Sequence, residues 1–198
     1  MAAVVPAVPA VPAKAQANVN PIGAHKKLRL AFYQGPGASL DASKSLALQA
    51  FQKDPDLVVR IVSPEDIRAG RLAGFDVLVQ SGGSGGGQGR ALGEAGRERI
   101  RVFVHCGGGY IGICAGSYLV SCDHPWSLGI LNAQVLDKKH WARGTGPVAV
   151  SFSERGRQVP GVSGDNLTLQ YGQGPLLAPA ADAKLPAYEP WARYEGAR

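Results

Sequence analysis

Three short apolar runs, each ending in a glycine-rich turn, most constrain how this chain can fold. They read LRLAFYQGPG from residue 28, DVLVQSGG from residue 76 and GYIGICAG from residue 109. Another apolar run, LVVRIV, covers residues 57–62, and segments with helical spacing lie between the runs. This alternation predicts a mostly parallel sheet covered on both faces, a three-layer α/β fold. The glycine turns would then gather at the carboxyl ends of the strands.

The connecting segments are predicted as helices. Apolar spacing from Leu40 to Phe51 predicts one helix, with Ser39 or Asp41 as its N-cap. A short capped helix is expected within residues 63–75, an amphipathic helix over 93–108 after a glycine loop, and another over 117–122. After residue 122 the pattern alternates, which predicts a small antiparallel region. The last residues, PAYEPWARYEGAR, look like the start of a helix.

The termini and the apolar content set the expected domain organisation. Residues 1–26 are expected to be a Pro/Ala-rich tail or linker, because a repeated V-P-A unit favours extended chain. Residues 27–198 are expected to form one domain, and a longer natural chain stays open. No apolar run reaches the roughly 20 residues that span a bilayer. A soluble protein is therefore expected, either cytoplasmic or exported; AKAQA is typical of a cleavage site, but no basic residue precedes the apolar stretch.

Charge and motif spacing exclude several classes of partner. The net charge of +6 comes from scattered Lys and Arg with no interleaved aromatic residues, so no specific nucleic-acid partner is expected. GGSGGGQG lacks the ending of a phosphate-binding loop, so no cofactor is expected. The three cysteines and four histidines lack metal-ligand spacing, so no metal is expected. A small-molecule substrate or ligand is the expected partner, and the oligomeric state stays open.

The stretch Gly112-Ile113-Cys114-Ala115-Gly116 predicts a nucleophile elbow with Cys114 as the catalytic residue. In such a strand-turn-helix, bulky side chains two positions before or after the nucleophile would clash, so both positions need glycine. The helix N-terminus would favour a thiolate, which attacks carbonyl carbons. The N–H of Ala115, with Gly82 and Gly83 from the glycine loop, would form the oxyanion hole. The alternative is close helix–strand packing around an inert cysteine.

The run from residue 76 to 121 resembles the class I glutamine amidotransferase-like superfamily, and within it the branch called biotin-protein ligase N-terminal-domain-like. The resemblance covers roughly residues 28–195 and implies a flavodoxin-like fold with Cys114 at the nucleophile position. Besides the elbow stretch, three matches to the branch's motifs carry it: Ser81-Gly82-Gly83, Trp141-Ala142-Arg143-Gly144, and Tyr171-Gly172-Gln173-Gly174-Pro175.

The resemblance also implies a His-x-Glu pair after a late strand, and this chain has QYGQGP there instead. The usual catalytic base is therefore not evident. His140 is the candidate substitute, and His105 and His124 flank the elbow stretch. A solvent-facing or capping role is the alternative for each of the three.

Four further residues are candidates for the pocket. Tyr171 and Gln173 replace the expected base and would line the site beside the cysteine. Arg143 would clamp a carboxylate, with Trp141 nearby. The alternative is that the aromatic residues pack on the sheet and Arg143 caps a helix carbonyl.

Three functions follow. In the first, Cys114 binds or hydrolyses a small amide- or ester-like substrate. In the second, the domain kept the elbow geometry, lost the base, and binds a small molecule or a protein without catalysis. The third is a cysteine or serine peptidase relative of the same superfamily.

Overall fold

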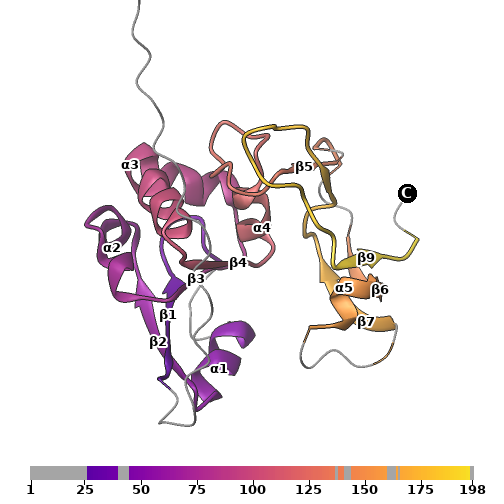
Figure 1. Ribbon diagram of the computed structural model, residues 1–198, viewed down its shortest axis with the longest axis horizontal. Coiled ribbons are helices and arrows are strands. Elements are labelled where there is room, and N and C mark those ends of the chain that lie inside the picture. The colour runs from indigo at the N-terminus through magenta and orange to yellow at the C-terminus, as the bar shows by residue number, and fades with distance from the viewer. Residues whose placement is uncertain are drawn as a thin grey trace, which may run out of the picture.

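The computed structural model describes residues 26–39, 45–136, 138–140, 144–159, 164 and 166–196. Four parallel strands form the central sheet (Figure 1) in the order β2-β1-β3-β4. They are β1 (Leu28–Tyr33), β2 (Leu57–Val62), β3 (Val77–Gln80) and β4 (Gly109–Gly112). The predicted mostly parallel sheet is confirmed, since every pairing in it is parallel. Apart from residue 26, the predicted tail lies outside the described residues.

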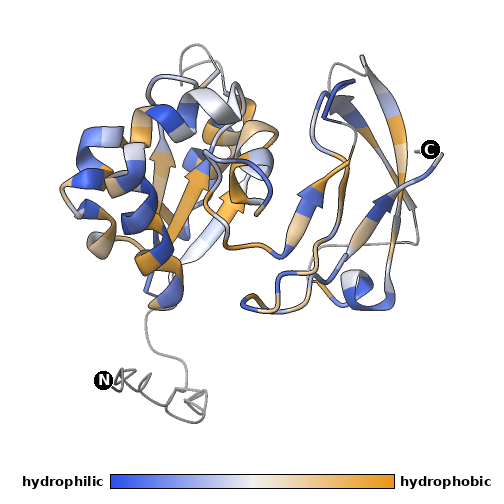
Figure 2. Ribbon diagram, turned by 90° about the horizontal axis from the view of Figure 1, so that it is seen from above, coloured by the Kyte–Doolittle hydropathy of each residue, from blue (hydrophilic) through white to orange (hydrophobic). Residues whose placement is uncertain are grey.

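Helices cover both faces of this sheet, which confirms the three-layer arrangement. Leu30 and Phe32 of β1 pack with Leu48 of α1 (Leu46–Lys53) on one face. Their neighbours Ala31 and Tyr33 belong to the core on the other face, under helices α2, α3 and α4. These helices are α2 (Pro64–Arg68), α3 (Gly85–His105) and α4 (Ala115–Val120), with a 3-10 turn, η2, at Arg71–Gly74. Figure 2 shows hydrophobic strands between helices whose outer faces are hydrophilic.

One predicted helix start is wrong, and one predicted loop is mostly helix. Helix α1 begins at Leu46 with Ser45 as its N-cap, whereas the backbone N–H of Ser39 donates to Gly82 in a loop. Helix α3 begins at Gly85 with Ser84 as its N-cap, so most of the predicted glycine loop is helix; the non-helical Gly93 kinks α3, and the helix predicted over 93–108 corresponds to the segment from this kink to His105. Tertiary packing overrides the low helix propensity of glycine here. A Cβ on Gly89 would lie 2.4 Å from the carbonyl oxygen of Trp126, so the small residue permits the contact.

The antiparallel region predicted after residue 122 is confirmed. β5 (Ala133–Val135) pairs with β8 (Leu177–Pro179), and β6 (Thr145–Phe152) lies between β7 (Asn166–Gly172) and β9 (Ala192–Tyr194). A short helix, α5 (Glu154–Arg157), follows β6. We call residues 28–120 the parallel part and residues 133–194 the antiparallel part.

The helix predicted at the end of the chain is wrong, because residues 192–194 form strand β9. Tyr194 pairs with Val150 of β6, and the N–H of Ser153 donates to the carbonyl oxygen of Trp191. Pro186 and Pro190 precede this strand, and proline disfavours a helix interior. Among the described residues, no helix has the length and apolar character needed to cross a bilayer.

Candidate functional site

Three turns meet at the carboxyl edge of the central sheet. Strands β3 and β4 end side by side, with Gln80 opposite Gly112, and the N–H of Ile113 donates to the carbonyl oxygen of Gln80 at 3.0 Å. The turn after β1 joins them through a single antiparallel bridge between Ala38 and Gly83. The sheet therefore places the glycine turn after β3 against the cysteine turn after β4.

Cys114 lies at the apex of a sharp turn between β4 and α4, with φ 50° and ψ −100°. A non-glycine residue with positive φ carries backbone strain, on the order of 1–3 kcal/mol. Two glycines make the turn sterically possible. A Cβ on Gly112 would lie 2.7 Å from the carbonyl carbon of Gly116, and a Cβ on Gly116 would lie 2.3 Å from the carbonyl oxygen of Gln80.

Two hydroxyl groups hold the turn in this shape. Ser117 Oγ donates to the carbonyl oxygen of Gly112 at 2.8 Å, and the Tyr110 hydroxyl donates to that of Gly116 at 2.9 Å. Burial raises the pKa of Tyr110 far above its usual value, so this hydroxyl keeps its proton. The cysteine is therefore held by hydrogen bonds as well as by packing.

The end of strand β7 faces Cys114 from the antiparallel part. Cys114 Sγ lies 3.8 Å from the carbonyl oxygen of Gly172, to which the thiol donates. The Tyr118 hydroxyl donates to the carbonyl oxygen of Gln173 at 3.3 Å. Among the described residues, Cys114 and Gln173 are the two non-glycine residues with positive φ. Cys114 and the Gly172–Gln173 segment, which contains the other strained residue, thus face each other across the candidate site.

Tyr171 and Tyr194 extend the site away from the cysteine. Their rings meet edge to face with centroids 5.6 Å apart, and the Tyr171 hydroxyl donates to the carbonyl oxygen of Gly174 at 2.7 Å. Burial first, and then Tyr171 and Cys114, raise the pKa of Tyr194. Sequence reasoning missed Tyr194, because it placed the residue in a helix and nothing local signals the pairing with β6.

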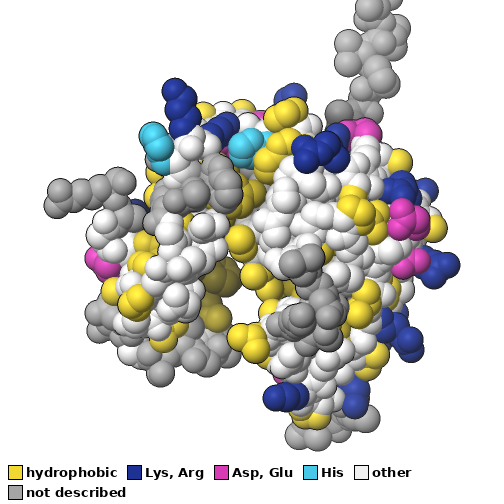
Figure 3. Space-filling model, turned by 180° about the vertical axis from the view of Figure 1, so that it is seen from behind, with side chains coloured by type: hydrophobic (Ala, Val, Ile, Leu, Met, Phe, Trp, Pro, Cys, Tyr) yellow, Lys and Arg dark blue, Asp and Glu magenta, His cyan; other side chains and the backbone are white. Residues whose placement is uncertain are grey.

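A cleft of about 780 Å³ lies beside Tyr194, within the range of small-molecule sites. Figure 3 shows the molecule hollowed between its two parts, with hydrophobic side chains around the hollow. Most of the lining is apolar, Arg193 is its single charged residue, and Ser117 of α4 connects the cleft to the cysteine turn. The lining residues are Ser117, Leu136, Val150, Pro175, Leu176, Leu177, Ala178, Pro179, Tyr188, Pro190, Ala192, Arg193 and Tyr194.

The predicted oxyanion-hole residues lie at the same sheet edge as Cys114. A Cβ on Gly82 would lie 3.6 Å from the Cβ of Cys114, so this glycine packs directly against the cysteine. Gly83 follows with φ +128°, which favours glycine. Ala115 is the first residue of α4, where a backbone N–H has no partner within the helix.

A buried glutamine pair supports the glycine turn, and sequence reasoning missed it. Gln88 of α3 and Gln80 of β3 are both fully buried. Gln88 Nε2 donates to the carbonyl oxygens of Ser81, Gly37 and Gly82 at 2.9, 3.2 and 3.3 Å. Gln88 lay in a segment predicted as a glycine loop, so its burial had no signal in the sequence.

The structure places the described histidines in different surroundings. His105 is the last residue of α3, before β4, and is therefore at the amino edge of the sheet. His124 stacks on Trp126 with ring centroids 4.3 Å apart, and burial lowers its pKa although Asp123 opposes this. His140 is exposed. Trp141 and Arg143 lie outside the described residues.

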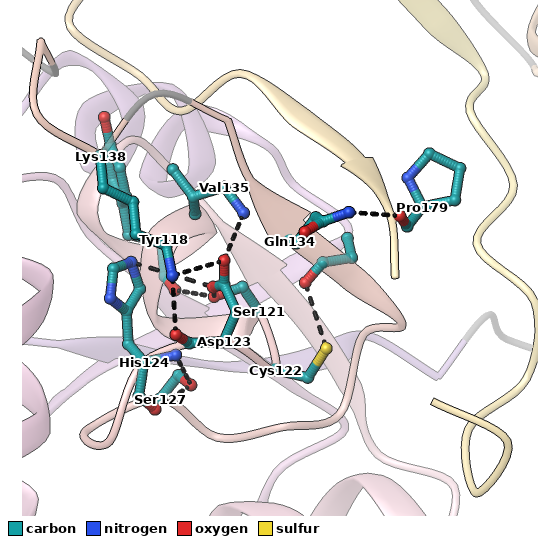
Figure 4. Close-up of polar contacts among 11 residues, drawn as sticks. Tyr118, Ser121, Cys122, Asp123, His124, Ser127, Gln134, Val135, Lys138 and Pro179 are labelled. Carbon is teal, nitrogen blue, oxygen red and sulfur yellow. Dashed lines mark hydrogen bonds and ion pairs between the residues drawn. The ribbon is translucent and has the colours of Figure 1, made fainter. Parts of the chain in front are cut away.

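Asp123 organises the turn that follows α4 (Figure 4). It accepts hydrogen bonds from the Val135 N–H at 2.8 Å and Ser121 Oγ at 3.0 Å, and pairs with Lys138 Nζ at 3.1 Å. Cys122, next to it, donates to the carbonyl oxygen of Ala133 at 3.4 Å. These contacts join α4 to β5, and so link the parallel part to the antiparallel part. Across the described ranges, no three His, Cys, Asp or Glu side chains are grouped to hold a metal ion.

The fold and the strained cysteine turn define a flavodoxin-like α/β protein with its candidate site at the carboxyl edge of the sheet. The family model described as biotin-protein ligase, N terminal, matches residues 28–145, and the chain belongs to this family. The resemblance stated from the sequence is thereby confirmed at the level of the family. The matched span includes the cysteine and glycine turns and ends at the start of β6, so β7 and β9 lie beyond it. A comparison with curated proteins gave no match.

Proposed function

We propose that this protein hydrolyses a small amide or ester through a thioester intermediate on Cys114. The observation that carries the proposal is the strained backbone of Cys114 at the apex of a strand-turn-helix, with Gly82 packed against it. This is the geometry of a nucleophile elbow, which exposes a nucleophile at the top of a sheet. The lack of room for a Cβ at Gly112 and Gly116 supports this interpretation. Packing around an inert cysteine would not require a strained turn.

Water accepts and donates the protons in the proposed reaction. The Cys114 thiol loses its proton to water, and the thiolate attacks the carbonyl carbon, forming a C–S bond as the C=O π electrons move to oxygen. The N–H groups of Gly82, Gly83 and Ala115 stabilise this oxyanion. Its collapse breaks the bond to the alcohol or amine, which takes a proton from water. A second water then hydrolyses the thioester to a carboxylic acid and the free thiol.

The cleft beside Tyr194 is the proposed place for the body of the substrate. Its lining of leucine, proline, valine and tyrosine favours an apolar acyl or leaving group. Tyr194 lines this cleft and Ser117 connects it to the cysteine turn, so a substrate in the cleft would extend toward the sulfur along these residues.

A panel of small amides and esters tests the proposal with wild type and Cys114→Ala. We expect the variant to lose hydrolysis by about 10³-fold or more, because a nucleophile has no substitute in such a mechanism. Cys106→Ala is the matched control, since Cys106 is an exposed free cysteine at the end of α3. Hydrolysis that persists unchanged in Cys114→Ala would remove the cysteine from the mechanism.

The second candidate is a binding domain without catalysis. The carbonyl oxygen of Gly172 beside Sγ favours it, because a carbonyl accepts a hydrogen bond but cannot serve as a general base. The pH dependence of Cys114 alkylation by iodoacetamide separates the two. Half-maximal alkylation well below the ordinary thiol value of about 8.5 supports an activated nucleophile, and a value near 8.5 supports binding without catalysis.

A further inference from the structure

We infer that Gln88 is a positioning residue that orients the glycine turn so that the N–H groups of Gly82 and Gly83 face an oxyanion formed at Cys114. The inference rests on the proposed function, because it assigns the residue that prepares the oxyanion hole of that reaction. Gln88 itself would touch neither substrate nor thiol, and would act through the two peptide groups it holds.

The hydrogen bonds of Gln88 fix the peptide groups of the glycine turn. Its Nε2 donates to two successive carbonyls of the turn after β3, those of Ser81 at 2.9 Å and Gly82 at 3.3 Å. The Gly82 carbonyl also accepts from the N–H of Ser39 at 2.7 Å. Both peptide planes are thus fixed from the side of α3 and the β1 turn.

In a trans peptide bond, C=O and the next N–H point in opposite directions. With the Ser81 carbonyl facing Gln88, the N–H of Gly82 points away from Gln88. With the Gly82 carbonyl facing Gln88 and Ser39, the N–H of Gly83 also points away. Gly82 itself lies between Ser39 and Cys114, since a Cβ there would be 3.3 Å from Ser39 Oγ and 3.6 Å from the Cβ of Cys114. The turn that Gln88 holds is therefore in contact with the cysteine.

The Gln88 amide is held in one orientation. Gln80 Nε2 donates to Gln88 Oε1 at 3.1 Å, so the Gln88 oxygen faces Gln80 and its nitrogen faces the carbonyls. A flipped amide would set its oxygen against the carbonyl oxygens of the turn. Gly37 allows the close approach, since a Cβ there would lie 2.3 Å from the Gln88 backbone nitrogen.

Gln80 offers the matched control. Both glutamines are fully buried, and both would become leucine in the same way. Gln80 bonds to Gln88 but not to the carbonyls of the glycine turn, and its Oε1 has no partner within the described residues. A general loss of core stability would affect both variants alike, whereas loss of peptide orientation would affect Gln88→Leu far more.

The experiment measures two reactions of Cys114 in wild type, Gln88→Leu and Gln80→Leu. Acylation by p-nitrophenyl acetate forms an oxyanion, and alkylation by iodoacetamide does not. We expect Gln88→Leu to acylate about 10²-fold more slowly, the scale of losing one oxyanion donor. We expect its alkylation rate to stay within about twofold of wild type, since displacement of iodide needs only an accessible thiolate. Gln80→Leu should slow acylation much less than Gln88→Leu, because Gln88 then loses its bond from Gln80 but keeps its carbonyl acceptors.

Four results would overturn the inference. Equal losses in acylation and alkylation, or equal losses in the two leucine variants, would make Gln88 a purely structural residue. A wild-type protein whose Cys114 is alkylated but never acylated would overturn the proposed function, and the inference with it. If Gln88→Leu does not fold, Gln88→Glu replaces it, because the protonated acid keeps the shape and one donor. Its acylation should fall below that of wild type, and an unchanged rate would also overturn the inference.

Discussion

The parallel and antiparallel parts of the molecule differ in how their strands are buried. In the parallel part, Phe32, Tyr33, Leu78 and Val79 are almost completely buried, because helices cover both faces of the sheet. In the antiparallel part, burial along β6 alternates and only Val150 of that strand is buried. The difference shows that the central strands β1 and β3 lie in a core covered on both faces, whereas β6 has one face open to solvent.

The two parts contribute different chemistry to the candidate site. The parallel part holds the cysteine turn and the glycine amides, whose positions must be exact to within a fraction of an ångström if the site performs the proposed hydrolysis. The antiparallel part brings the Gly172 carbonyl, Tyr194 and most of the cleft. We therefore expect substitutions in the parallel part to affect stability or the chemical step, and those in the antiparallel part to affect substrate binding.

The largest effect is expected from Gly116→Ala in the parallel part. Its new Cβ would lie 2.3 Å from the carbonyl oxygen of Gln80, so the backbone must move. Overpacking of this kind costs about 3 kcal/mol, and a rigid sheet edge cannot relax easily. Gly74→Ala is the control, because nothing lies within 4 Å of its Cβ. Urea unfolding measures both, and similar free energies of unfolding for the two variants would mean that the turn is adjustable.

A matched pair of leucine substitutions compares the two sheets directly. Leu78→Ala in β3 removes a fully buried side chain and is expected to cost about 3 kcal/mol of the free energy of unfolding. Leu169→Ala in β7 removes a half-buried side chain and is expected to cost about 1 kcal/mol. Chemical denaturation of both variants measures the difference. Equal costs would contradict the contrast between strands buried on both faces and strands with one face open to solvent.

Tyr194→Leu tests the role of the antiparallel part in binding. The substitution removes an aromatic ring from the wall of the cleft and its contact with Tyr171. We expect the KM for an apolar p-nitrophenyl ester to rise about tenfold, equivalent to about 1.4 kcal/mol of binding, while kcat changes little. Steady-state kinetics measures this. A fall in kcat with unchanged KM would instead assign Tyr194 to the chemical step.

The smallest effect is expected at the junction of the two parts, where Asp123 joins α4 to β5. Burial would raise the pKa of Asp123, but the Val135 N–H, Lys138 and Ser121 outweigh it and hold the pKa below its usual range. Its contribution to stability is therefore present above about pH 4, the ordinary value, and is lost as the pH falls through the lowered pKa.

Asp123→Asn should cost about 1 kcal/mol at pH 7, since a neutral amide weakens these hydrogen bonds. The deficit relative to wild type should shrink as the pH is lowered below about 4, because the unfolded wild-type carboxyl then binds a proton that the folded one takes up only at lower pH. Thermal unfolding between pH 7 and pH 3 follows this change. A deficit that stays constant over that range would show that the charge of Asp123 contributes nothing to the junction.

Much of the fold was predictable because its signals are local. Apolar runs such as LRLAFY and DVLVQ, each followed by glycine, define buried strands ending in turns. The start of α3 was not predictable, since glycines at residues 85–87 have low helix propensity and the packing of Trp126 against Gly85 and Gly86 leaves no local pattern. Strand β9 was also missed, because pairing with β6 across about forty residues leaves no local pattern.

For the candidate site, the sequence by itself determined the cysteine turn, since only glycine fits at residues 112 and 116 around a residue with the φ of Cys114. It did not determine what faces the sulfur. The tertiary structure alone decided that the Gly172 carbonyl, Gln173 and Tyr194 lie there, and that Gln88 holds the glycine turn. The reason is physical: a sharp turn around a nucleophile needs glycine on both sides, so the requirement leaves a motif, even though the clash at Gly116 is with Gln80 of β3. Contacts between distant segments depend instead on how the sheets pack, and no short pattern encodes that packing.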